Sequence, residues 1–290
     1  MNESISGLDE ATVLASVRQA LREDVGGGDL TTDATIAPAQ TARASVISKE
    51  AGVVCGIEVA RVVFMEVDSR IDFDALRKDG DMVSPRDRLF TVSGAARSLV
   101  TAERVALNFM QRMSGIATAA ARMCAIAAPY GVRILDTRKT APGLRLLDKY
   151  AVRAGGASNH RLGLYDMALI KENHVALAGG VARAIRLVKE HLRAQQRHAR
   201  IEVEVETLEQ LREALAEGVD YIMLDNFTLE QIGAAVKLAR TTGTRAELEI
   251  SGNVTLSNLP AYIATGVQRI SSGALTHSVT ALDLSMLVEI

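Results

Sequence analysis

Charged and small side chains follow apolar runs at six places in the second half of this 290-residue chain. Helical stretches lie between most of these runs, and strands that alternate with helices at this spacing predict parallel βαβ units. Because the carboxyl ends of parallel barrel strands open onto one mouth, the side chains that follow the runs are expected to lie together there. The positions are residues 136–140, 171–174, 204–206, 225–226, 251–253 and 271–274. One polar strand end is ordinary, whereas six of them predict the active site of an enzyme.

The predicted mouth is rich in groups that carry positive charge or can take it up. They are Arg138, Lys139, His160, Arg161 and Lys171. A guanidinium offers a planar fork that suits carboxylate and phosphate, and an ammonium offers a compact point charge. The whole chain has 33 Lys+Arg against 35 Asp+Glu, a net charge of −2, so it has no global basic field of the kind that nucleic-acid binding requires. This local concentration of cations predicts a small, strongly anionic ligand.

Two carboxylates, Glu204 and Asp225, end strands with no obvious partner beside them in the sequence. Carboxylates on separate strands that face one anion suit Mg²⁺ held through a phosphate-bearing substrate and water. The alternative is a structural ion-pair network. Residues 251–253 and 272–274 are small and precede predicted helices, where backbone amides favour a monophosphate, although glycines there can also serve only as tight turns.

The predicted fold is α/β, with an N-terminal α+β domain followed by a C-terminal β/α barrel of about six parallel strands. We expect boundaries at 1–115, 116–275 and 276–290, the last segment being a helix that packs back on the N-terminal domain. Periodicity predicts helices over 8–23 and 96–129, the second broken at Gly115, and a β-rich module over 42–94. The barrel strands are expected at 132–137, 167–174, 200–207, 221–226, 246–252 and 269–275, with helices at 143–153, 176–195, 207–217, 228–240 and 255–265. Arg104 and Arg112 lie off the apolar stripe of helix 96–129, which is typical of solvated side chains.

Several other classes of protein are disfavoured. Residues 1–10 lack the basic and apolar regions of a secretory signal, and no run of about 18 apolar residues predicts a membrane span. Cys55 and Cys124 fit no disulfide or metal pattern, so a reducing cytoplasm is the expected location. The three glycines at 26–28 lack the motif of a phosphate loop and predict a structural turn.

The sequence resembles the quinolinate phosphoribosyltransferase family. The resemblance rests first on the 40-residue block LDTRKTAPGLRLLDKYAVRAGGASNHRLGLYDMALIKENH at 135–174. It continues through 101–118, 202–210, 223–227 and 250–286, and it includes the segment GGGDLTTDATI near the N-terminus. It implies a two-domain enzyme that makes nicotinate mononucleotide, pyrophosphate and CO₂ from quinolinate and phosphoribosyl pyrophosphate, in NAD biosynthesis. It also implies a homodimer in which each active site is completed by the neighbouring subunit. The net charge and the lack of a long apolar run predict no nucleic-acid or membrane partner.

The resemblance implies roles for individual residues. Arg138, Lys139, His160, Arg161 and Lys171 would line the substrate pocket, and Arg104 would be donated across the dimer to the quinolinate carboxylates. Glu204 and Asp225 would bind the ribose hydroxyls and Mg²⁺, and together with Lys139 and Lys171 they form the expected catalytic set. The 5′-phosphate would be held by Ser251, Gly252, Asn253, Gly273, Ala274 and Leu275. Many members have glycine where Asn253 stands, but asparagine also supplies an amide and tolerates positive φ.

Two alternatives remain open from the residues. One is a related phosphoribosyltransferase that acts on another anionic ring such as nicotinate, which would need fewer cationic contacts than a dicarboxylate. The other is a catalytically inactive barrel that serves as a binding or regulatory module. The presence of Lys171, Glu204 and Asp225 favours an enzyme over this second alternative.

Overall fold

The N-terminal sheet has four antiparallel strands, and its edge comes from the far end of the chain. The computed structural model describes residues 8–289, and the sheet order is β12 (Leu284–Glu289), β1 (Thr41–Ser48), β5 (Arg88–Ala95) and β3 (Asp72–Ala75). The helix predicted within 276–290 is therefore wrong for 284–289, which pairs with β1 along its length. Burial alternates at the start of β12, where Leu284 and Met286 are buried, as expected for a strand.

Two compact units divide the chain, and both are discontinuous in sequence. The first holds the described residues up to Ala121, Thr140–Gly156 and those from Ser278, and the second holds Arg122–Lys139 and Ala157–His277. The remaining elements of the first unit are α1 (Glu10–Val25), α2 (Leu30–Thr35), β2 (Gly52–Val53), α3 (Ile57–Val67), β4 (Met82–Val83) and α5 (Arg145–Ala154). The glycines at 26–28 form a turn as predicted, and the carboxylate of Asp29 then caps α2 by accepting the Thr32 amide.

Helix α4 (Ala96–Ala127) differs from the prediction at two residues. It runs through Gly115 without a break, and a Cβ at this glycine would lie 2.2 Å from the carbonyl oxygen of Thr280. Gly115 thus permits a close approach of the C-terminal segment. Arg112, predicted to be solvated, instead donates two hydrogen bonds of 2.9 and 2.7 Å to Asp148, whose side chain is fully buried. Asp148 also accepts the amide of Ala141, so it joins α4, α5 and the segment before α5.

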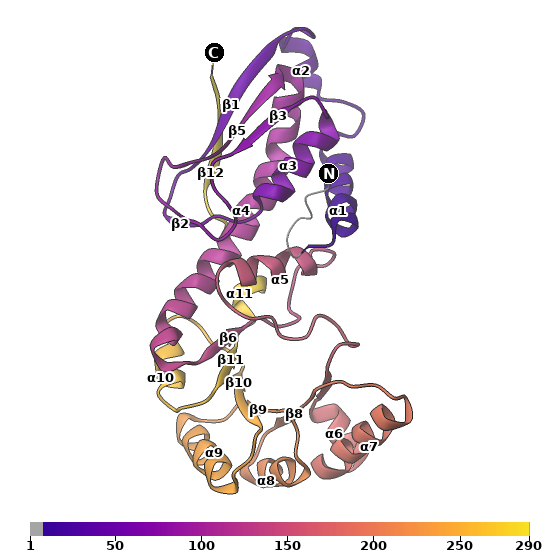
Figure 1. The fold of residues 1–290 in the computed structure, drawn as a ribbon, viewed down its shortest axis with the longest axis vertical. Coiled ribbons are helices and arrows are strands. Elements are labelled where there is room, and N and C mark those ends of the chain that lie inside the picture. Colours follow the sequence, from indigo (N-terminus) through magenta and orange to yellow (C-terminus); the bar gives the residue numbers. More distant parts are fainter. Residues whose placement is uncertain (1–7, 290) are drawn as a thin grey trace. The chain divides into compact units, whose positions relative to one another are not determined.

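The second unit contains the six parallel strands that the sequence predicts. Their order is β6 (Arg133–Leu135), β11 (Arg269–Ser271), β10 (Glu247–Ser251), β9 (Tyr221–Asp225), β8 (Ile201–Val205) and β7 (Ala168–Ile170). The helices are α6 (Glu172–Ala178), α7 (Val181–Ala194), α8 (Leu208–Glu217), α9 (Leu229–Thr242), α10 (Leu259–Ile263) and α11 (Ala274–His277), and the short η1 (Ala128–Tyr130) precedes β6. Helices α6 to α9 follow the outside of the curved sheet in Figure 1. No helix of the described chain is long and apolar enough to cross a membrane.

Candidate active site

The carboxyl ends of three neighbouring strands bring predicted site residues together. Glu204 on β8 lies opposite Met223 of β9, and Asp225 of β9 lies opposite Ser251 of β10. Side chains two residues apart on a strand share a face, so Glu204, Asp225 and Ser251 all lie on one face of the sheet. The prediction that separate strand ends converge is confirmed for these residues.

Lys171 and Glu204 form an ion pair at this end of the sheet. The Lys171 Nζ lies 2.6 Å from Glu204 Oε2, and the Glu204 side chain is only 6% exposed. Burial raises the pKa of Glu204, while the hydrogen bond from Lys171 opposes this shift and the charge of Asp225 adds to it. Glu204 therefore has a partner that its sequence neighbours do not reveal, because Lys171 directly follows the adjacent strand, β7.

Two guanidinium groups lie near one another in the second unit. Burial, and then the positive charge of Arg138, lowers the pKa of Arg161. Arg138 is half-buried just after β6, and the side chain of Arg161 reaches the carbonyl of Met167 at 3.4 Å. The negative charges of Glu202 and Asp166 oppose this shift, so Arg161 has acidic as well as basic neighbours.

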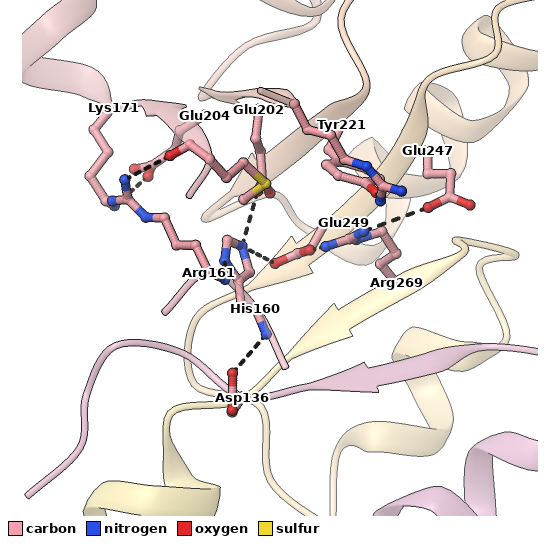
Figure 2. A network of polar contacts seen from close by, with 12 residues as sticks. Asp136, His160, Arg161, Lys171, Glu202, Glu204, Tyr221, Glu247, Glu249 and Arg269 are labelled. Atoms are coloured by element: carbon pink, nitrogen blue, oxygen red, sulfur yellow. Dashed lines mark hydrogen bonds and ion pairs between the residues drawn. The ribbon is translucent and has the colours of Figure 1, made fainter. Parts of the chain in front are cut away.

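His160 is more deeply buried than was expected for a cationic side chain at the open mouth of a barrel. Its side chain is 5% exposed, and Nε2 lies 3.0 Å from Glu202 and 3.5 Å from Glu249. The amide of Arg161 donates to Nδ1 of His160, and Asp136 accepts the backbone amide of His160. Figure 2 shows the two glutamates directed at the imidazole. The geometry suits His160 to positioning Arg161.

The buried glutamates around His160 belong to a network that the sequence prediction missed. Arg269 Nε donates to Glu249 at 2.8 Å, and its guanidinium lies over the Tyr221 ring with 3.7 Å to the centroid (Figure 2). Burial, and then the negative charge of Glu249, raises the pKa of Glu202. The available signal was the alternation of acids in apolar strands, which places Glu202 and Glu204 on one face.

His160, Glu202 and Glu249 are of metal-ligating types, and one ligand atom of each lies within 4.8 Å of those of the other two. Because Nδ1 of His160 accepts the Arg161 amide, the proton of a neutral imidazole is on Nε2, the atom that faces the glutamates. This proton occupies the lone pair that a metal ion would need. The arrangement therefore fits a hydrogen-bonded cluster better than a metal site.

The predicted phosphate loop after β10 is held by side chains of its own segment. Gly252 has φ of 100° and Asn253 has φ of 50°, the left-handed conformation that asparagine tolerates. The side chain of Asn258 donates to the carbonyl of Asn253 at 2.8 Å and accepts the amide of Thr255. The helix predicted over 255–265 is shorter, Leu259–Ile263, so the loop does not lead directly into a helix. Its role in binding phosphate stays a prediction.

The other predicted residues are distributed between the units. Lys139 is exposed after β6, and Gly273, Ala274 and Leu275 follow β11, all in the second unit. Arg104 is exposed on α4 in the first unit.

The chain is similar to known proteins over nearly its whole length. The model of the quinolinate phosphoribosyl transferase N-terminal domain matches residues 29–114, and that of the C-terminal domain matches residues 116–287. A carboxylating, chloroplastic nicotinate-nucleotide pyrophosphorylase of Arabidopsis thaliana is 46% identical over 95% of this chain and 82% of its own. A probable carboxylating nicotinate-nucleotide pyrophosphorylase of Bacillus subtilis is 43% identical over 91% of this chain and 89% of its own. The solved nicotinate-nucleotide pyrophosphorylase of Francisella tularensis superimposes with a TM-score of 0.92 at 40% identity, with all of both chains covered.

Proposed function

The chain belongs to the quinolinate phosphoribosyltransferase family, and from this membership and the site we infer that it is a carboxylating nicotinate-nucleotide pyrophosphorylase. It transfers the phosphoribosyl group of phosphoribosyl pyrophosphate to quinolinate and releases pyrophosphate and CO₂, and nicotinate mononucleotide remains. The observation that carries the inference is the Lys171–Glu204 ion pair at the carboxyl ends of the parallel strands, in the same unit as the guanidiniums of Arg138 and Arg161. Forked cations suit the two carboxylates of quinolinate, and the strand-end acids suit the ribose.

The reaction begins with the loss of pyrophosphate from C1 of the ribose. The bonding electrons leave with the pyrophosphate, so positive charge builds on the sugar. We assign Glu204 and Asp225 to stabilise that charge, and Lys139 and Lys171 to neutralise the leaving group. The fixed ion pair of Glu204 with Lys171 holds this carboxylate in place before substrate arrives, which reduces the reorganisation that the reaction requires.

Nitrogen of the pyridine ring then bonds to C1, and the ring becomes cationic. The adjacent carboxylate leaves as CO₂, its bonding electrons stay on the ring carbon beside the cationic nitrogen, and a proton takes them up. Arg138 and Arg161 orient the dicarboxylate for this sequence, with His160 positioning Arg161 through its backbone amide. The 5′-phosphate is assigned to Ser251, Gly252, Asn253, Gly273, Ala274 and Leu275.

Glu204 and Asp225 are also the residues that would hold Mg²⁺, partly through substrate and water. Both offer hard oxygen ligands, and their charges are close enough for Asp225 to raise the pKa of Glu204. A Cβ at Gly252 would lie 3.9 Å from Asp225 Oδ1, so this carboxylate also faces the predicted phosphate loop. Mg²⁺ bound there would supply positive charge to the pyrophosphate.

A related enzyme acting on nicotinate is the second candidate. The human nicotinic acid phosphoribosyltransferase structure is similar with a TM-score of 0.59 at 15% identity, a likeness that shows the fold alone. The number of cations assigned to the ring substrate favours the dicarboxylate.

The decisive experiment incubates the purified chain with quinolinate, phosphoribosyl pyrophosphate and Mg²⁺. We expect CO₂ and nicotinate mononucleotide in equal amounts. A parallel incubation with nicotinate in place of quinolinate should give no nucleotide. Product from nicotinate alone would overturn the assignment in favour of the second candidate.

Asp225→Asn tests the role of the strand-end acids. Loss of this negative charge should lower Mg²⁺-dependent turnover by about a hundredfold, the usual cost of removing one electrostatic contribution to a transition state. Quinolinate binding, measured by calorimetry, should stay within about twofold of the wild type, because the dicarboxylate is assigned to the arginines. Lost quinolinate binding in a folded variant would contradict this role.

We also propose a homodimer with shared active sites, in which Arg104 reaches the site of the partner subunit. Arg104→Ala and Lys139→Ala should each be nearly inactive, because each removes a cation from every site. When the two variants are mixed and allowed to exchange subunits, mixed dimers contain one intact site and should regain activity. Verified mixed dimers that stay inactive would refute sharing.

The expected location is the cytoplasm. Two plant relatives carry names that place them in chloroplasts or mitochondria, so this location is a property of each protein and not of the family. We propose no nucleic-acid or membrane partner.

A further inference from the structure

Three arginines lie at the amino ends of the parallel strands. Arg133 is the first residue of β6, Arg269 is the first residue of β11, and Arg200 directly precedes β8. All six strands are parallel, so these residues lie at the edge of the sheet opposite to the carboxyl ends that carry Glu204 and Asp225. A five-residue strand such as β8 separates its two ends by about 13 Å. The arginines therefore belong to the end of the sheet away from the candidate catalytic acids.

A cavity of about 250 Å³ lies at this edge, and we call it the amino-end cavity. The three arginines line it together with Tyr221, the first residue of β9, and Ser158. His160 and Arg161 also line it, so the cavity reaches the buried network around His160. Drug-sized ligands occupy cavities of about 300–1,000 Å³, and one water molecule takes up about 30 Å³. The amino-end cavity thus suits a small ion accompanied by a few waters.

Acids balance two of the three arginines. Arg269 Nε donates to Glu249 at 2.8 Å, and Nη1 of Arg269 lies 3.7 Å from Glu247 (Figure 2). Arg133 also pairs with Glu247. Asp166, an acid that lines the cavity, accepts two backbone amides of its own segment, which offset part of its charge.

Arg200 is the arginine whose charge is not balanced in this way. Among residues 8–289, no carboxylate oxygen lies within 4.0 Å of its guanidinium nitrogens. Its Nη1 donates to the hydroxyl of Tyr221, and its guanidinium lies 5.5 Å from the centroid of the Tyr221 ring. Tyr221 thus holds a charged fork at the cavity. Because the hydroxyl accepts the bond from Arg200, it keeps its own hydrogen for another acceptor.

We propose that the amino-end cavity is a second anion site, which binds a small oxyanion through the guanidinium of Arg200 and the hydroxyl of Tyr221. A guanidinium presents parallel N–H donors to two oxygens of such an anion, and hydrogen bonds between charged groups are among the strongest in proteins. The shared chemistry is present in inorganic phosphate and in small carboxylates, and separate titrations distinguish the two. The site goes beyond the proposed function, which uses neither Arg200 nor Tyr221.

Crystals grown with selenate test the position of the anion. Selenate is a small tetrahedral oxyanion with an anomalous scatterer, so its binding sites can be located directly. We expect selenate within hydrogen-bonding distance of Arg200 in the wild type and none in the amino-end cavity of Arg200→Met. This variant should fold, because Arg200 is exposed and takes no part in the buried ion pairs. A wild-type cavity without selenate would overturn the inference.

Calorimetry measures the affinity in solution. Phosphate, and separately malonate, is titrated with phosphoribosyl pyrophosphate and Mg²⁺ present and quinolinate absent, so that the candidate active site is occupied. Arg200→Met should bind the preferred anion at least about tenfold more weakly than the wild type, as expected for the loss of hydrogen bonds between charged groups. Arg183→Met, at an exposed arginine of α7, is the matched control and should bind as tightly as the wild type.

The outcomes separate this inference from the proposed function. Wild-type affinity of Arg200→Met for both anions would overturn the inference, because selenate in the cavity would then be an adventitious ion only. If phosphoribosyl pyrophosphate does not bind, the proposed function fails, and the position of selenate still reports on the amino-end cavity. If Arg200→Met does not fold, the same measurements on Arg200→Gln, which also lacks the charge, decide the question.

Discussion

Replacing Lys171 with methionine is expected to lower kcat/KM by about a thousandfold. The change removes a cation from the site and leaves the carboxylate of Glu204, 6% exposed, without the ammonium that lies 2.6 Å away. One preorganised electrostatic contact contributes about a hundred- to a thousandfold to catalysis, and an unpartnered buried carboxylate adds to the loss. Steady-state release of CO₂ from quinolinate measures the effect.

Two further variants make this experiment specific. Lys171→Arg keeps the charge but has a planar fork in place of a compact ammonium, so we expect partial activity. Lys237→Met makes the same lysine-to-methionine change at an exposed position of α9 outside the site, and its kcat/KM should equal that of the wild type. A folded Lys171→Met enzyme that keeps more than about a tenth of wild-type kcat/KM would show that this cation is not required.

Arg112→Met is expected to lower the free energy of unfolding by about 3–5 kcal/mol. Asp148 is fully buried and accepts both hydrogen bonds from the Arg112 guanidinium, so the variant leaves a buried carboxylate that still accepts the Ala141 amide but has lost its cation. Chemical denaturation followed by circular dichroism measures the change.

Restoring charge balance should recover much of this stability. The double variant Arg112→Met with Asp148→Asn removes both charges and is expected to be more stable than Arg112→Met alone, because the desolvated carboxylate is gone. Arg122→Met, at an exposed arginine of the same helix, is the control and should cost less than about 0.5 kcal/mol. If Arg112→Met and Arg122→Met had the same free energy of unfolding, the buried pair of Arg112 and Asp148 would contribute nothing to stability.

The sequence predicted the six parallel strands because their pattern is local. Each strand is short, most are followed by a helix of the same unit, and such repeats have few possible arrangements. The predictions that were wrong concern contacts between distant segments. A glycine at position 115 is typical of a helix break, but here it makes room for the carbonyl of Thr280. Arg112 lies off the apolar stripe like a solvated side chain, but its partner, Asp148, is 36 residues away in the sequence.

The same contrast between local patterns and distant contacts applies to the site residues. Strand ends identified Glu204, Asp225 and Lys171, since parallel strands place such residues at one edge whatever the details of packing. The depth of His160 could not be predicted, because it depends on Glu202 and Glu249 in two other strands. The apolar stripe of α4 gave no sign that Arg104 has a function, and only the family resemblance assigns it one.

The pairing of β12 with β1 has a consequence for biosynthesis. Strand β1 ends at Ser48, but its partner begins at Leu284, so the whole of the second unit is synthesised between the two strands. Until residues 284–289 have been synthesised, one edge of β1 is an open template for strand addition, and the N-terminal sheet is incomplete. The nascent chain must keep this edge apart from other nascent chains during that interval.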